Sequence, residues 1–291
     1  MNFATLICTI KTIVCHFYLW YYTIRVYFEV NGMFKFKIRT MRCYITGGFV
    51  LLTFILAMIY LPDNKQNNDD SLTETTVEGT TAPTSHKISG VPIIAQNELR
   101  AACETYACTM LLNYYNFSID EFEFAQNYLI TYPVAYGEDG NLYGPDMNAA
   151  FAGDVYTGWG VNAPAMAKSM NKYLETQKTD KRAQALSNVE LDDICKNYID
   201  NDIPAMVWVT TYMQEPYVKS TWIVDYVDEN SKVKIGDTVS WLQNEHCMVL
   251  VGYDEDNYYF NDSVAEKVTA AKKVVAEERY SQVGKQAIVL Q

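Results

Sequence analysis

Residues 245–262 read EHCMVLVGYDEDNYYFND, two apolar runs of strand length separated by a short acidic segment. The run 246–253 is almost continuously apolar after its first residue, which is typical of a strand that is buried on both sides. The run 258–262 is aromatic and ends in Asn-Asp, and the intervening residues 254–257 are polar turn formers. We therefore predict a buried antiparallel hairpin over these residues.

The pattern on either side of this hairpin predicts the fold class. Helices are predicted over 100–115, 118–130, 163–175, 187–201 and 270–283, and strands over 91–94, 205–210, 217–225, 238–242 and 287–290. The second and fourth helices begin at the capping boxes Ser118-x-x-Glu121 and Ser187-x-x-Glu190. A Gly-, Pro- and Asp-rich loop is predicted over 132–162. Helices in the first half and an antiparallel sheet in the second half indicate an α+β fold.

The N-terminal part of the chain has a membrane pattern. Residues 43–61, CYITGGFVLLTFILAMIYL, carry no charge, and as a helix they would span about 28 Å. The basic tail 1–42 precedes this run, which predicts a transmembrane anchor with the body outside the cytoplasm. A cleaved signal peptide is the alternative. The apolar stretch 3–23 is either a second span or lies upstream of a true start at Met33.

Composition limits the partners of the rest of the chain. Residues 62–87 are polar and Thr-rich, which predicts a flexible linker between the anchor and a folded domain over 88–291. The chain has 291 residues and a net charge of −12, although its first 42 residues are basic. An acidic body repels phosphate backbones, so no nucleic acid partner is expected. The expected contacts are the membrane, through the anchor, and a peptide or cell-wall-derived substrate.

The cysteines and histidines identify candidate catalytic residues. Seven cysteines are present without any C-x-x-C pair, so no metal site is predicted. Cys103 lies at the predicted start of a helix, where the dipole favours a thiolate nucleophile. His246 is the one histidine of the predicted domain, because His16 and His86 lie in the tail and the linker. A cysteine in a helix is more often a buried apolar residue than a nucleophile.

Two further residues complete this pattern. Asp262, at the end of the returning strand, is predicted to orient His246, with Asn261 as its rival. An ideal hairpin register would leave Asp262 about 10 Å from its position opposite His246, so a bulge or bend is required. Gln96 lies on the segment that leads to Cys103, and its amide is a candidate oxyanion donor beside the Cys103 N–H.

With these residues in place, the chain resembles the papain-clan cysteine peptidases that process double-glycine leader peptides, and more closely the bacterial peptidase-like family related to them. The resemblance covers 91–291. It rests on Val91-Pro92, Cys103-Glu104, Gly158-Trp159-Gly160 and the segments 203–209, 245–254, 258–262 and 278–280. It implies a papain-like cysteine peptidase fold and a cofactor-free thioester mechanism.

The resemblance implies a role for each candidate. Cys103 would be the nucleophile, His246 the base, Asp262 its orienting group and Gln96 the oxyanion donor. The chain departs from the family by having Ala101-Ala102 before the cysteine and Ser263 after Asp262, where the family usually has Thr-Gly and Pro.

Two questions stay open at this point. Trp159 and Gly160 are predicted either to line the substrate cleft or to pack the loop that contains them. An acyl or amide transferase with the same residues and a catalytically silent binding module are the alternatives to a hydrolase.

Overall fold

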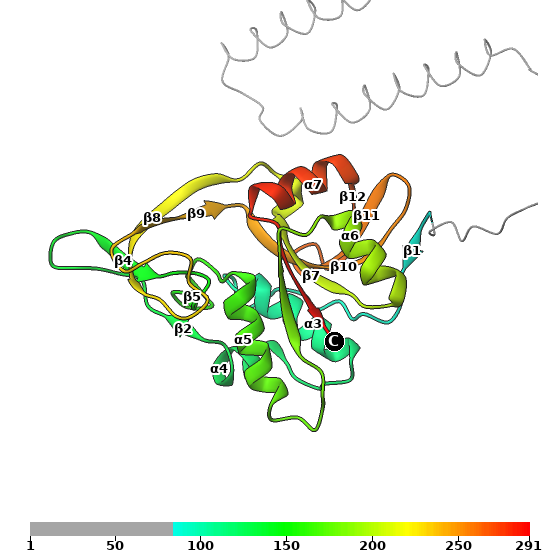
Figure 1. Cartoon of the computed structure of the whole chain (residues 1–291), viewed down its shortest axis with the longest axis horizontal. Helices are drawn as coiled ribbons and strands as arrows, with labels where there is room; N and C mark the ends of the chain where they lie inside the picture. Colours follow the sequence, from blue (N-terminus) through cyan, green and yellow to red (C-terminus); the bar gives the residue numbers. More distant parts are fainter. Residues whose placement is uncertain (1–83) are drawn as a thin grey trace, which may run out of the picture. The chain divides into compact units, whose positions relative to one another are not determined.

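The computed structural model describes residues 84–291, which form a domain around one antiparallel sheet (Figure 1). Its strand order is β12-β11-β10-β7-β13-β6, and β1 pairs with the far end of β10. The strands are β1 His86–Lys87, β6 Ala183–Ser187, β7 Ala205–Thr210, β10 Glu245–Tyr253, β11 Asn257–Asp262, β12 Lys267–Lys272 and β13 Gln286–Leu290. The predicted hairpin is confirmed as β10 and β11.

Helices cover both faces of this sheet, as Figure 1 shows. They are α3 Cys103–Tyr114, α4 Glu121–Asn127, α5 Ala163–Leu174, α6 Leu191–Asn197 and α7 Lys273–Gln282. Cys247 and Val249 of β10 belong to the apolar cluster that contains α3 and α5, whereas Met248 and Leu250 belong to the one that contains α6 and α7. Both faces of β10 are therefore buried, which explains its continuous apolar sequence.

Small sheets replace much of the predicted loop over 132–162. One consists of β3 Ala135–Tyr136, β4 Leu142–Pro145, β8 Tyr217–Tyr226 and β9 Thr238–Gln243, and the other of β2 Thr131–Tyr132 and β5 Phe151–Ala152. Both contain a parallel pair, β4 with β8 and β2 with β5. The predicted antiparallel pairing is therefore correct for the main sheet and for β8 with β9, but not for the pairs β4–β8 and β2–β5.

Both predicted capping boxes are wrong. The N-cap of α4 is Asp120, whose side chain accepts a hydrogen bond from the backbone N–H of Glu123. Ser187 is the last residue of strand β6, where it pairs with Gln286, and α6 begins four residues later. Serine at these positions matches the local motif, but the pairing of β6 with β13 determines the backbone at Ser187.

Three other local predictions also need correction. Residues 91–94 are not a strand, because they belong to an irregular segment whose Val91 and Pro92 carbonyls accept hydrogen bonds from the Asn261 amide. The predicted helix 270–283 begins only at Lys273, after β12. The predicted linker ends early, because His86 and Lys87 already pair with β10.

The membrane predictions fall mainly on residues outside the described range. The tail 1–42, the anchor 43–61 and most of the linker 62–87 belong to this part of the chain. Within residues 84–291, no helix is both long and apolar enough to cross a bilayer.

Candidate active site

Cys103 is the first residue of α3, as predicted, and its thiol is half-buried against β10. The backbone N–H of Cys247 donates a hydrogen bond to the sulfur over 3.4 Å. The sulfur therefore lies beside the residue that follows His246 in the chain. Cys103, Cys108, Cys195 and Cys247, the cysteines of the described domain, are all free thiols.

His246 and Asp262 form a buried pair. His246 Nε2 lies 2.9 Å from Asp262 Oδ1, and both side chains are almost fully buried. The backbone N–H groups of Val264 and Ala265 donate to the same carboxylate oxygen. Because Asp262 engages Nε2, the free ring nitrogen of His246 is Nδ1. The predicted partner of His246 is thus the one that the fold provides, and its rival Asn261 binds backbone carbonyls instead.

A register shift brings this pair together. Tyr253 pairs with Tyr258 near the turn, but Val249 pairs with Asn261, so one residue of β10 is inserted between Leu250 and Gly252. The inserted residue moves Asp262 one position closer to His246 along the two strands. From there the two side chains are diagonal neighbours, which long side chains can bridge. The irregularity that the sequence required is present.

The ionisation of Asp262 is consistent with this pairing. Burial opposes the ionised carboxylate, but the hydrogen bond and charge of His246 together with the two backbone N–H groups outweigh it. The pKa of Asp262 therefore lies below its ordinary value. An ionised Asp262 can orient the imidazole and stabilise its protonated form.

Gln96 lies in the same region, but its amide group is engaged. Its Nε2 donates to the backbone carbonyls of Leu99 and Arg100, over 3.3 and 3.1 Å. Its Oε1 accepts a hydrogen bond from the hydroxyl of Ser263 over 3.0 Å. The structure thus holds Gln96 between the residue after Asp262 and the turn that leads to Cys103. Its role as an oxyanion donor stays a prediction, and it requires the amide to leave these carbonyls.

The contact of Ser263 was not predicted from the sequence. Its hydroxyl fixes the orientation of the Gln96 amide, and its backbone carbonyl accepts from the Gln96 N–H over 2.9 Å. The sequence marked Ser263 only as a departure from the proline of the family. A proline has no hydroxyl, so this link to Gln96 depends on the departure.

Glu104 is a second residue that the sequence analysis did not assign. Its carboxyl group is buried, and Oε2 lies 3.4 Å from the sulfur of Cys103. Oε1 accepts a hydrogen bond from the backbone N–H of Val161 over 3.0 Å. Gly160 has φ +126°, and a Cβ at this position would lie 2.6 Å from Oε1. The sequence signal for this role was the acidic residue directly after the candidate nucleophile.

Electrostatics oppose the predicted activation of the thiol. Burial raises the pKa of Cys103 well above its ordinary value, and the charges of Glu104 and Glu245 add to this effect, although the N–H of Cys247 counteracts it. Burial also raises the pKa of Glu104. Burial and the nearby Glu104 raise the pKa of Glu245 to about 8. These surroundings therefore act against the thiolate expected at the helix start, which stays a prediction.

Trp159 packs against Trp222 and Gly153. Its ring lies 5.9 Å from that of Trp222 and directly over Gly153, where a Cβ would come within 3.1 Å of the indole. Gly160 lies beside Glu104 and hence next to the nucleophile. A part for Trp159 and Gly160 in a substrate cleft stays a prediction.

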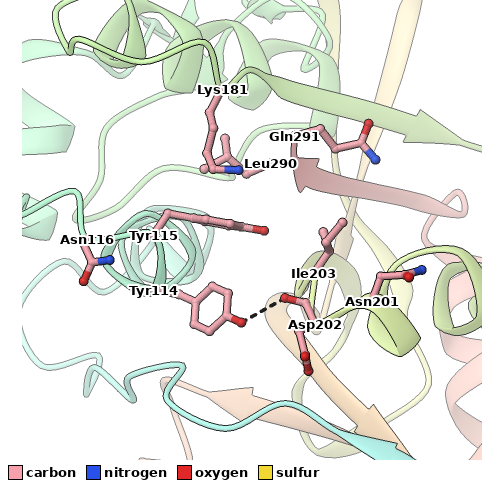
Figure 2. Close-up of a pocket in the computed structure, with 9 residues that line it drawn as sticks. All are labelled: Tyr114, Tyr115, Asn116, Lys181, Asn201, Asp202, Ile203, Leu290 and Gln291. Atoms are coloured by element: carbon pink, nitrogen blue, oxygen red, sulfur yellow. Dashed lines mark hydrogen bonds between the residues drawn. The ribbon is translucent and has the colours of Figure 1, made fainter.

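A cavity of about 780 Å³ lies at the other end of α3 (Figure 2). Its walls include Tyr114 and Tyr115, and the hydroxyl of Tyr114 donates to the backbone carbonyl of Asp202. Lys181 lies 4.4 Å from the centre of the Tyr115 ring. Because α3 has 12 residues, this end of the helix is about 17 Å from Cys103. The cavity is thus separate from the candidate active site.

A thiol at a helix start, beside a His–Asp pair on two adjacent strands, is the arrangement of papain-type cysteine peptidases. Comparison with known proteins specifies the class further. The chain belongs to the Peptidase_C39-like family, whose model matches residues 88–288.

Three known proteins are similar to this chain. The uncharacterised protein YvpB of Bacillus subtilis (strain 168) is 27% identical over 206 residues, which cover 68% of this chain and 74% of YvpB. A crystal structure described as a C39-like peptidase from Bacillus anthracis is 25% identical, with a TM-score of 0.57 over 71% of this chain and 97% of that one. The peptidase domain of Streptococcus ComA matches at 12% identity over 69% of this chain and 98% of that one, with a TM-score of 0.39.

Proposed function

We propose that this protein is a cysteine peptidase-like hydrolase that cleaves a peptide or amide bond through a thioester on Cys103. The observation that carries the proposal is the buried His246–Asp262 pair, with 2.9 Å between Nε2 and Oδ1. The thiol of Cys103 lies beside it and accepts a hydrogen bond from the N–H of Cys247, the residue after His246. The family of the chain supports a peptidase-like activity.

The proposed reaction assigns one task to each group. As the sulfur of Cys103 bonds to the substrate carbonyl carbon, the thiol proton passes to Nδ1 of His246. Asp262 stabilises the resulting imidazolium, which then gives its proton to the leaving amine. Water then attacks the thioester as its proton passes to the imidazole, and the imidazolium returns this proton to the sulfur as the acid leaves. The backbone N–H of Cys103 and the Gln96 amide would stabilise the oxyanion.

The proposed location is outside the cytoplasm, with the domain held at the membrane by residues 43–61. The uncharged run and the basic residues before it support this topology. A peptide or a cell-wall-derived fragment is the substrate class that such a location offers. External protease added to intact cells is expected to release the domain by cutting within 62–83, and full protection of the domain would contradict the topology.

One observation favours a catalytically silent binding module instead. The pKa of Cys103 is raised by burial and by Glu104, so the resting thiol is largely protonated at neutral pH. Such a thiol reacts slowly unless a substrate or a base activates it.

Incubation of the purified full chain with synthetic peptides and muropeptides tests the function. Mass spectrometry should detect cleavage products with the wild type and none with Cys103→Ala. Cys195→Ala is the matched control, because this buried cysteine lies among α6 residues in the other apolar cluster. An acid-quenched reaction should also contain an acyl adduct on Cys103. Cleavage that persists in Cys103→Ala would exclude the proposed mechanism, and the absence of cleavage by the wild type would favour the binding module.

A further inference from the structure

Glu104 is the charged group in direct contact with the candidate nucleophile. Its Oε2 lies 3.4 Å from the sulfur of Cys103, and its Oε1 accepts the N–H of Val161. Both carboxyl oxygens therefore face hydrogen-bond donors, the thiol on one side and the backbone on the other. Although burial raises the pKa of Glu104, these two hydrogen bonds act in the opposite direction and favour the ionised carboxylate.

The surroundings of Glu104 do not neutralise it with a cation of fixed charge. Among the ion pairs formed by residues 84–291, none joins Glu104 or Glu245 to a lysine or arginine. The titratable groups near Glu104 are Cys103 on its own helix, and Glu245, His246 and Cys247 on β10. The loop packed on the other side contributes Gly160 and the Val161 N–H, neither of which is charged.

The loop also keeps the carboxylate in place. Because Gly160 approaches Oε1 without a side chain, residues 160–161 close over Glu104 and exclude water from it. A buried charge interacts more strongly with its neighbours than an exposed one. The sulfur thus lies next to a negative charge that solvent screens poorly.

We propose that Glu104 sets the protonation state of the nucleophile, by accepting the thiol hydrogen bond of Cys103 and holding the sulfur in its neutral form in the resting site. The inference rests on the proposed function, and it adds a regulating residue to that site. No bond to sulfur is broken in the resting state. The proton leaves the sulfur only for Nδ1 of His246, when the S–C bond to the substrate forms.

This arrangement has a chemical advantage for a free thiol outside the cytoplasm. Oxidation of cysteine proceeds through the thiolate, so a thiol that is held protonated is oxidised slowly.

Alkylation of the full chain with iodoacetamide, followed residue by residue by peptide mass mapping, tests the inference. Glu104→Gln retains an oxygen for the Val161 N–H but removes the charge beside the sulfur. We expect Cys103 to be alkylated at least about tenfold faster at pH 7.5 in this variant, with the midpoint of its pH profile lowered by about one unit or more, since one pKa unit is a tenfold change in thiolate. Dilute hydrogen peroxide should oxidise Cys103 faster in the variant as well.

Glu98→Gln is the matched control. Glu98 is an exposed carboxylate five residues before Cys103, so its removal changes the net charge near the helix start without touching the sulfur. It should leave the alkylation rate of Cys103 within about twofold of the wild type, because exposed charges are well screened.

The inference is overturned if Glu104→Gln alkylates Cys103 at the wild-type rate or more slowly. If this variant does not fold, the wild type decides alone, because an alkylation midpoint for Cys103 below the ordinary value of about 8.5 would contradict a thiol that is held neutral. Alkylation reports on the thiol and not on turnover. If cleavage depends on Cys103 but Glu104→Gln does not change the alkylation rate, only this inference is refuted. If cleavage survives Cys103→Ala, the proposed function is refuted.

Discussion

Replacing Asp262 with Asn tests the proposed catalytic pair most directly. Asparagine has the same shape, and its oxygen can still accept the backbone N–H groups of Val264 and Ala265. His246 Nε2 contacts this same oxygen, Oδ1, so the amide oxygen keeps all three contacts and the variant loses only the negative charge. The imidazole would thereby keep its orientation, but the imidazolium formed when His246 takes the thiol proton of Cys103 would lose the anion that stabilises it.

The expected magnitudes follow from this geometry. Replacing the charged acceptor of a buried hydrogen bond with a neutral one should cost about 1 kcal/mol of stability, which is the difference between hydrogen bonds to charged and to neutral groups. Loss of the anion beside the imidazolium should reduce turnover by about 10²-fold or more, which is the usual contribution of general acid–base catalysis. Because the pKa of Asp262 is lowered, its stabilising effect is present above the unfolded value of about 3.9 and is lost as the pH falls through the folded pKa. The stability of the variant should therefore lack the part of its dependence on acidic pH that Asp262 causes.

The assay combines turnover with thermal and urea unfolding of the same preparations. Asp256→Asn is the control, because this carboxylate lies in the same hairpin but is exposed and pairs only with Lys272. It should change stability by less than about 0.5 kcal/mol and leave turnover intact. Turnover by Asp262→Asn within about tenfold of the wild type would refute the role assigned to the pair.

Three other variants test neighbouring parts of the site. Ser263→Ala should reduce turnover about tenfold, because it releases the Gln96 amide, and it should cost at most about 1.5 kcal/mol of stability. Ser263→Thr, which keeps a hydroxyl, should restore turnover. Gly160→Ala should lower the melting temperature more than Gly236→Ala, because both have positive φ but only the first places its Cβ against a buried carboxylate; equal losses would argue against that contact. Glu245→Gln should stabilise the protein increasingly as the pH rises from about 5 toward 8, by up to about 1.4 kcal/mol per pH unit, because the folded state binds a proton there that the unfolded state lacks. Chemical denaturation at several pH values measures this gain in stability, and a gain that does not change with pH would contradict the raised pKa of Glu245.

The main elements could be predicted from sequence because each has a clear periodicity of apolar residues or a long apolar run. The strand over 205–210 and the hairpin of 246–262 consist of apolar segments that only a buried strand accommodates. The helix over 163–174 has an amphipathic pattern and a proline in its first turn. Short elements without such patterns, among them β6 and β12, were missed because tertiary pairing forms them.

The identity of the histidine–aspartate pair also followed from sequence, since residues 88–291 contain one histidine and the returning strand ends in an acid. Its geometry did not, because contact between His246 and Asp262 depends on a residue inserted in β10. No local motif marked that residue, and the strand register that accommodates it is a property of the whole sheet.

By itself, the sequence determined the order of the main elements, the choice of Cys103, His246 and Asp262, and the resemblance to a peptidase family, because these depend on residue type and on spacing along the chain. Only the tertiary structure showed that burial and Glu104 raise the pKa of the Cys103 thiol and that Ser263 contacts Gln96. The physical reason is that burial and charge act through space. The groups that determine the ionisation of Cys103 include its neighbour Glu104 and also Glu245 and Cys247, more than 140 residues away, and their effects combine only when α3 packs against β10.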